Sequence, residues 1–207
     1  MDKYLRKELA ILKGKNVAVV GNAISILGTQ QGSAIDSHDI VIRLNLRFPR
    51  LEECEDVGAK TDLFYAGDVL KNYGLKNGDT YNGVIAFDKN RKLGQRMQNK
   101  WHLLNPKSLY NKDKVHYGNT TCYYPTSGQL CICDCIIHGA SIIYVYGFDC
   151  WNTGDRYSDK IPATGWTVGR IIETKRMRIL IEDYNIIPDK KLSEVIKGEV
   201  NELTTNS

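Results

Sequence analysis

The sequence of 207 residues has no long apolar run and little excess of charge of either sign. No hydrophobic segment approaches the roughly 18 residues of a membrane span, so we expect no transmembrane segment. The net charge of +4 is too small to indicate a nucleic-acid partner. The first residues, Met1-Asp-Lys-Tyr-Leu-Arg-Lys-Glu, lack the apolar core of a secretory signal. If the chain is complete, these features predict a cytoplasmic protein.

Two common nucleotide-binding motifs are also missing. Gly21 follows an apolar strand, but no second glycine stands two positions later, and Gly28 comes too late for G-x-G-x-x-G. This spacing argues against NAD binding. No G-K-S/T sequence marks a Walker phosphate loop. A nucleotide site in this chain must therefore use other residues.

Cysteine is present six times, and three of these residues stand close together. On a helix, Cys131, Cys135 and His138 would share one face, which leaves a metal site geometrically open. Free cysteine also packs as a small buried hydrophobe, and this is the interpretation that we favour.

Apolar strand patterns alternate with helical patterns, which predicts one α/β domain over residues 1–207 with a mostly parallel sheet flanked by helices. The expected strands are residues 17–20, 40–44, 63–65, 83–87, 142–147 and 184–187. The expected helices are an N-terminal one with Leu5, Leu9 and Leu12, followed by residues 68–75, 89–101, 127–137 and 167–183. Residues 149–165 lack apolar periodicity and are expected to form a flexible lid loop, and residues 199–207 a loose tail.

Small hydrogen-bonding residues follow two of these strands and precede one helix. Gly21 and Asn22 end the first strand and Asn45 ends the second, so both amides are expected at the carboxyl edge of the sheet, where ligands bind. Thr126-Ser127-Gly128 precedes an apolar helix, where a hydroxyl caps the helix and free N–H groups attract a phosphate or carboxylate. Each feature alone also fits ordinary turn or cap chemistry.

Together, the two regions resemble the sialyl motifs of the sialyltransferases. VAVVGNAISILG…IDSHDIVIRLN…VGAKTDLFY resembles the large motif of the animal-type family, glycosyltransferase family 29, and YPTSG…IIYVYGF resembles the small motif. The second segment and GFDCWNTGDRY are also similar to the bacterial family 42. The matched parts cover about 16–66 and 122–157. The resemblance implies a GT-A-like domain, a CMP-sialic acid donor, a glycan acceptor and no cofactor or required metal, and the chain has no D-x-D motif.

The resemblance also implies roles for particular residues. Asn22 and Asn45 would hold the phosphate and the sugar–ribose region of the donor, and Ser127 and Gly128 would lie against the CMP or the sialyl carboxylate. Tyr157 falls where a family 42 tyrosine contacts the leaving phosphate. Trp151 replaces the earlier tyrosine of the family 42 pair and is a further donor-binding candidate. The same segments supply three more: Gly21, Thr126 and Gly147. The implied mechanism is an inverting displacement.

The chain departs from both families at the histidine that begins their last core helix. Val168 stands in its place, although Glu173 matches the glutamate that follows it in family 29. His116, just before the second motif, is the substitute that we favour as the base, and Asp149 and Asp155 are alternatives. Arg170 is expected to neutralise the phosphate in place of a histidine. His38 belongs to the first motif and is expected to be structural.

These observations favour a metal-independent glycosyltransferase that moves sialic acid, or a related acidic sugar, from a CMP donor to a glycan hydroxyl. The missing histidine keeps open a degenerate member that binds a nucleotide or glycan with little or no turnover. A different nucleotide-sugar donor is a third possibility. An α/β domain of unrelated function is a fourth, since such folds host many functions.

Overall fold

The computed structural model describes the backbone of residues 7–44, 48–66, 80–81, 84–86, 115–117, 120–122, 126–150 and 167–204. Side chains are described for residues 9–44, 48–65, 126–150 and 173–198. The helices predicted at 68–75 and 89–101 lie outside the described residues, as does the lid beyond Cys150. None of the helices in these described parts is long and apolar enough to cross a membrane.

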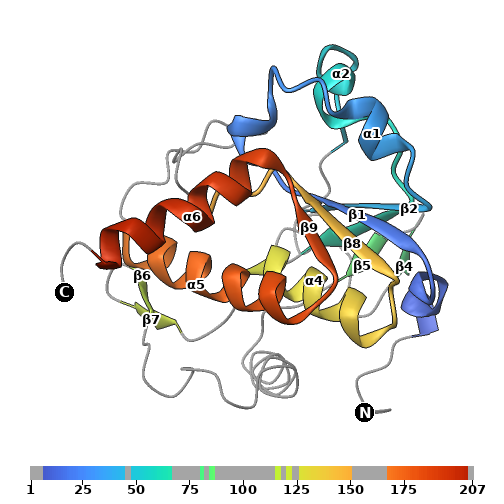
Figure 1. Ribbon diagram of the computed structural model, residues 1–207. Helices are drawn as coiled ribbons and strands as arrows, with labels where there is room; N and C mark the ends of the chain where they lie inside the picture. Colours follow the sequence, from blue (N-terminus) through green and yellow to red (C-terminus); the bar gives the residue numbers. More distant parts are fainter. Residues whose placement is uncertain are drawn as a thin grey trace.

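A single sheet of seven strands forms the centre of the described structure (Figure 1). Neighbouring strands follow the order β4-β5-β3-β2-β1-β8-β9, and all pairs are parallel except β4 with β5. Their bounds are β1 (Asn16–Val20), β2 (Ile40–Leu44), β3 (Leu63–Ala66), β4 (Thr80–Tyr81), β5 (Val84–Ala86), β8 (Ile142–Tyr146) and β9 (Ile186–Pro188). The predicted mostly parallel α/β sheet is therefore confirmed.

Strand β1 marks the point at which the strand order reverses. From β1 the chain moves outward through β2, β3 and β5, and it returns to place β8 on the other side of β1. In open α/β sheets, ligands bind beyond the carboxyl ends of the strands at such a point. The topology therefore draws attention to the residues that follow β1, β2 and β8.

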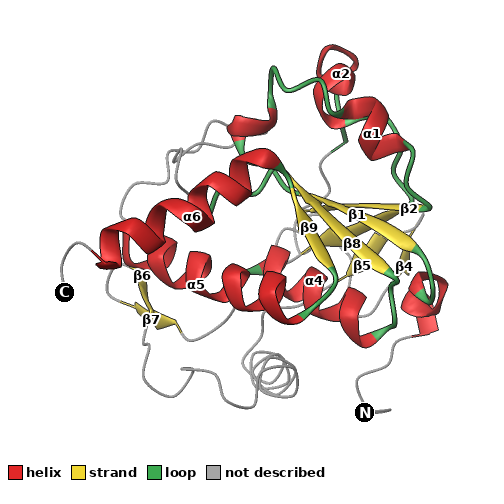
Figure 2. Ribbon diagram, viewed as in Figure 1, coloured by secondary structure: helices red, strands yellow, loops and turns green. Residues whose placement is uncertain are grey.

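Helices cover both faces of the sheet (Figure 2). Successive side chains of a strand point to opposite faces, and in β1 Val17 and Val19 belong to one buried cluster, while Ala18 and Val20 belong to another. The first cluster includes residues of the 3-10 helix η2 (Lys7–Leu12), α4 (Ser127–Ile137), α5 (Thr167–Asp183) and α6 (Lys190–Thr204). The second includes residues of the 3-10 helix η3 (Ile24–Ile26), α1 (Gly32–Asp36) and α2 (Cys54–Val57).

Helices α4 and α5 have the predicted bounds, and the N-terminal helix is the 3-10 helix η2, in which Leu9 and Leu12 are buried. Helix α6 was not predicted. It occupies residues 190–204, so the loose tail expected from residue 199 is wrong as far as Thr204. Leu192 is buried against the core and anchors the first turn of α6. Once a helix is nucleated, each further residue adds a hydrogen bond, which extends it into a polar segment.

Candidate functional site

The aromatic ring of Phe148 joins the two sequence motifs at the carboxyl edge of the sheet. A Cβ atom added to Gly21, after β1, would lie 2.8 Å from Cδ2 of this ring. A Cβ atom added to Gly128, in the first turn of α4, would lie 2.8 Å from Cζ on the other edge. The ring therefore fills the space between two glycines from segments that are distant in the sequence. Any larger residue at either position would displace it.

Asn22 links the ends of two neighbouring strands. Its side-chain amide makes a long hydrogen bond of 3.5 Å to the backbone oxygen of Leu44, the last residue of β2. Asn22 is half-buried and lies next to Gly21 at the reversal point of the sheet. Asn45 directly follows Leu44 but lies outside the described residues. The described part places one of the two predicted amides at the expected edge.

The N-terminus of α4 is closed by Thr126 and Gln129. The Thr126 hydroxyl oxygen accepts the Gln129 N–H, and Oε1 of Gln129 accepts the Thr126 N–H at 3.2 Å. This reciprocal capping box satisfies two groups that a helix end leaves open. Within the described residues, the hydroxyl of the next residue, Ser127, makes no such bond. The Thr126 hydroxyl is thus used in the helix cap, whereas the Ser127 hydroxyl has no hydrogen bond to a described residue.

Glu173 on α5 reaches the same helix terminus. Its Oε1 accepts a hydrogen bond from the Thr126 hydroxyl at 3.2 Å, and its backbone oxygen accepts one from Nε2 of Gln129 at 3.0 Å. The glutamate is only 7% exposed. The positive end of a helix dipole favours a carboxylate at this position. These contacts fix the first turn of α4 against α5.

Gly147 forms a tight turn between β8 and Phe148. Its φ of 65° is a left-handed conformation that glycine adopts without steric cost. The Gly147 oxygen accepts the Ala23 N–H at 3.0 Å, and its N–H donates to Oδ2 of Asp189 at 2.8 Å. Both the N–H and the carbonyl oxygen of Gly147 are therefore hydrogen-bonded within the protein. The predicted contact of Gly147 with the sugar donor depends on other atoms.

Two buried carboxylates lie near this turn. Burial raises the pKa of Asp189 above its usual range, and the neighbouring charge of Asp149 adds to this, while the N–H groups of Leu192 and Gly147 oppose it. Asp149 is itself buried directly after Phe148. Asp149 thus lies beside the site, as its role as an alternative base requires.

The remaining predicted residues are only partly placed. His116 lies on β6 (Val115–Tyr117), which pairs with β7 (Thr120–Cys122) and contacts α5. Arg170 and Val168 lie in the first turn of α5, but their side chains are not among the described ones. Tyr157, Trp151 and Asp155 are outside the described residues. Their predicted roles stay predictions.

The three cysteines of α4 lie in the core. Cys131, Cys133 and Cys135 are buried, and burial raises the pKa of the Cys131 thiol well above its usual value. Nδ1 of His138 lies 2.7 Å from the backbone oxygen of Asp134. In the part of the chain that the structure describes, no three His, Cys, Asp or Glu residues are arranged to hold a metal. These cysteines pack as hydrophobic residues in this helix.

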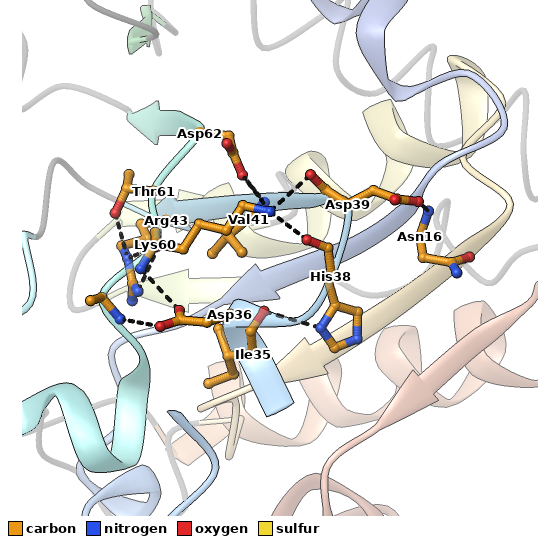
Figure 3. Close-up of polar contacts among 11 residues, drawn as sticks. Asn16, Ile35, Asp36, His38, Asp39, Val41, Arg43, Lys60, Thr61 and Asp62 are labelled. Carbon is orange, nitrogen blue, oxygen red and sulfur yellow. Dashed lines mark hydrogen bonds and ion pairs between the residues drawn. The ribbon is translucent and has the colours of Figure 1, made fainter. Parts of the chain in front are cut away.

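The charged residues of the first motif lie mostly at the opposite, amino edge of the sheet (Figure 3). The Asp36 carboxylate accepts the N–H groups of Ala59 and Lys60, and the Lys60 ammonium donates to the backbone oxygens of His38 and Asp39. The buried His38 ring packs on Tyr144 with 4.2 Å between ring centroids. His38 has the structural role that the sequence predicts.

Three features of the site were not predicted from the sequence: the position of the Phe148 ring, the hydrogen bond between Thr126 and Glu173, and the contact of the Asp189 carboxylate with Gly147. One signal was present, because Gln129 stands three residues after Thr126, as in a capping box. Asp189 also precedes an apolar repeat of Leu192, Val195 and Ile196. The position of the Phe148 ring has no such local signal.

Comparison with known proteins agrees with these observations. Residues 8–80 match the model of glycosyltransferase family 29 (sialyltransferase), and the match ends before the second motif. The fold is shared with a mammalian sialyltransferase in complex with Gal-beta-1-3GalNAc-ortho-nitrophenol, with a TM-score of 0.54, 17% identity, and coverage of 89% of this chain and 77% of that one. A second structure of a mammalian sialyltransferase gives a TM-score of 0.53 and 18% identity at the same coverage. The resemblance of this chain to the sialyltransferases is confirmed, while that to bacterial family 42 stays a prediction.

Proposed function

We propose that this protein, with the fold of the sialyltransferases and a family 29 match over residues 8–80, transfers sialic acid or a related acidic sugar from a CMP donor to a glycan hydroxyl. The family match and the fold support a glycosyltransferase of sialyltransferase type. The donor, the inversion at the anomeric carbon and the independence from metal are parts of the proposal.

The observation that carries the proposal is the meeting of the two motifs around Phe148. Gly21 and Asn22 from the first motif and Gly128 from the second lie at one edge of the sheet, at the point where the strand order reverses. Neither motif alone distinguishes a ligand site from a turn or a helix cap. Their convergence around one ring favours a composite site that both segments build.

The chemistry of this edge suits a phosphate or carboxylate. The first turn of α4 presents backbone N–H groups and the positive end of a helix dipole. Ser127 adds a hydroxyl that forms no hydrogen bond with a described residue, and the Asn22 amide can donate a hydrogen bond from the neighbouring strand end. A donor that carries both a phosphodiester and a sugar carboxylate matches such a set of donors.

The transfer needs a base for the acceptor hydroxyl and a group that stabilises the leaving phosphate. We assign the base to His116, because β6 runs beside α5, the helix in which Val168 replaces the family histidine. Asp149 is the alternative, since it is buried next to the Phe148 turn. Tyr157 and Arg170 are assigned to the phosphate, as the resemblance implies.

Binding of CMP tests the donor site directly. Thermal unfolding with millimolar CMP, against CDP, UDP, GDP and NAD, should show selective stabilisation by CMP, since a ligand at about a hundred times its Kd adds roughly 2.7 kcal/mol. Ser127→Ala should weaken CMP binding about tenfold or more, through loss of a hydrogen bond to a charged group. Ser141→Ala is the matched control, because Ser141 is exposed before β8 at the other edge of the sheet. Equal CMP affinity for both variants would remove Ser127 from the site.

A second function is binding without turnover. The observation that favours it is Val168, which leaves the first turn of α5 without a histidine. CMP-selective stabilisation with no release of CMP from CMP-sialic acid, tested over a panel of glycan acceptors, would support this function. Transfer by the wild type would instead identify an active enzyme, with His116 as the base if transfer is lost in His116→Ala but kept in Asp149→Asn. Selective stabilisation by UDP or GDP would indicate a different donor.

A further inference from the structure

Asp189 lies outside every segment that has so far been related to function. It follows Pro188 at the carboxyl end of β9, the edge strand next to β8. The family match ends at residue 80, and the motif resemblance ends at about residue 157. Asp189 is nevertheless only 7% exposed, and among the described residues its carboxylate forms no ion pair, which is unusual for a buried aspartate.

The two carboxylate oxygens of Asp189 bind two different elements. Oδ1 accepts the N–H of Leu192 at 2.8 Å, which caps the first turn of α6. Oδ2 accepts the N–H of Gly147 at 2.8 Å, across 42 positions of the sequence. A serine or threonine would cap the helix equally well. The bond from Oδ2 to Gly147 joins β9 to the end of β8, which a helix cap alone does not require, although the Lys191 N–H also contributes to the carboxylate.

Gly147 transmits this contact to the site. Its N–H is held by Asp189 on the β9 side, and its oxygen is held by the Ala23 N–H on the β1 side. The next residue, Phe148, is the ring that fills the space between Gly21 and Gly128. Loss of the bond on the β9 side would leave the turn free to shift and would release the ring from its position.

We propose that Asp189 is a positioning residue, whose carboxylate holds the Gly147–Phe148 turn and thereby the geometry of the donor site. Asp189 has no direct contact with the ligand in this arrangement. The role of Asp189 in donor binding rests on the proposed function. The hydrogen bond by which it fixes Gly147 is independent of that function.

Asp189→Ser removes one of the two hydrogen bonds and keeps the other. The serine hydroxyl can still accept the Leu192 N–H and cap α6, but it is too short to accept the Gly147 N–H as well. The matched control is Ser193→Ala, which removes a hydroxyl bonded at 2.8 Å to the backbone oxygen of Asp189 and leaves its carboxylate intact. We expect amide exchange at Gly147, followed by NMR on protein labelled with ¹⁵N-glycine, to become at least tenfold faster in Asp189→Ser only. CMP affinity should fall tenfold or more in the same variant and stay unchanged in the control.

A variant that loses stability but keeps the wild-type exchange rate at Gly147 would overturn the proposal. Wild-type CMP affinity in a folded Asp189→Ser protein would overturn its link to the donor site. If the wild type itself binds no CMP, the proposed function fails, but the exchange comparison still decides whether Asp189 holds the turn. Asp189→Thr, which also keeps the cap and lacks the second oxygen, is the second variant if serine prevents folding, and the same exchange result is expected from it.

Discussion

Substitution of the two glycines that contact Phe148 gives the sharpest test of the site. In Gly128→Ala, the new methyl group would lie 2.8 Å from Cζ of the ring and closer still to Cε1. Carbon atoms are in favourable contact at about 3.5–4.0 Å, so the ring would have to withdraw by roughly 1 Å. The opposite edge of the ring faces Gly21, which leaves no space on that side.

The expected cost follows from overpacking. Forcing an extra methyl group into a packed core costs about 1–3 kcal/mol. Alanine is a better helix former than glycine by up to about 1 kcal/mol, which offsets part of this cost in the first turn of α4. We therefore expect Gly128→Ala to lose about 1–2 kcal/mol of unfolding free energy, measured by urea denaturation with unchanged m-value.

Phe148→Leu should relieve the clash in Gly128→Ala, because the atoms that the methyl group meets belong mainly to the ring. A double-mutant cycle should give a favourable coupling of about 1 kcal/mol or more. Gly21→Ala is the control, since its methyl group would also strike the backbone oxygen of Gly147, which truncation of the ring leaves in place. Additivity within about 0.5 kcal/mol for Gly128→Ala and Phe148→Leu would refute the placement of the ring.

Three further predictions concern the surrounding structure. Tyr65→Phe should lower the unfolding free energy by about 1.5–3 kcal/mol, because the buried Tyr65 hydroxyl donates to Asp134 at 2.7 Å; a loss below about 0.5 kcal/mol in urea denaturation would contradict this. Thr126→Ala should cost about 1 kcal/mol through loss of the α4 cap, while Thr126→Ser should stay close to wild type by thermal unfolding; equal loss in both would argue against the cap. Burial raises the pKa of Asp189, so the folded state binds the proton of this carboxyl more tightly than the unfolded state does. The stability that the protonated Asp189 contributes is therefore lost as the pH rises from about 3.8 through the pKa of the folded state. The unfolding free energy of the wild type relative to Asp189→Asn should therefore fall with pH over that range, by at most about 1.4 kcal/mol per pH unit. A rise would show that the N–H groups bonded to the carboxylate outweigh burial.

Local patterns were sufficient for most of the fold. β2, α4 and α5 have the bounds that the sequence predicts, and β1, β3 and β8 differ by one residue at an end. β5 is one residue shorter at each end, and β9 begins two residues later than predicted and ends one later. Strand and helix formation depend on apolar periodicity and on capping residues within a few positions, which a single sequence displays directly. The elements that were missed are α6, the short β4, the β6–β7 pair, the short helices α1 and α2, and the 3-10 helices η3 and η4 (Leu51–Glu53). They are short or have mixed polar sequences, which carry a weaker periodic signal.

Candidate residues were also identified from local patterns, though less completely. The structure places Gly21 and Asn22 after β1 and Thr126-Ser127-Gly128 at the start of α4, as the sequence indicates. It adds a distinction that the sequence could not make. The Thr126 hydroxyl is hydrogen-bonded to Gln129 and Glu173, while the Ser127 hydroxyl has no hydrogen bond to a described residue. Asn45, Tyr157 and Trp151 lie outside the described residues and stay predictions.

Sequence alone therefore determined which segments form strands and helices, and which polar residues stand at their ends. Only the tertiary structure decided which of these ends meet, because the contacts that join them cross 42 residues from Gly147 to Asp189, 47 from Thr126 to Glu173 and 69 from Tyr65 to Asp134. Such contacts depend on the order of strands in the sheet, to which no local pattern is sensitive. The Phe148 ring lies between two glycines because β1, β8 and α4 converge there, and this convergence exists only in the folded chain.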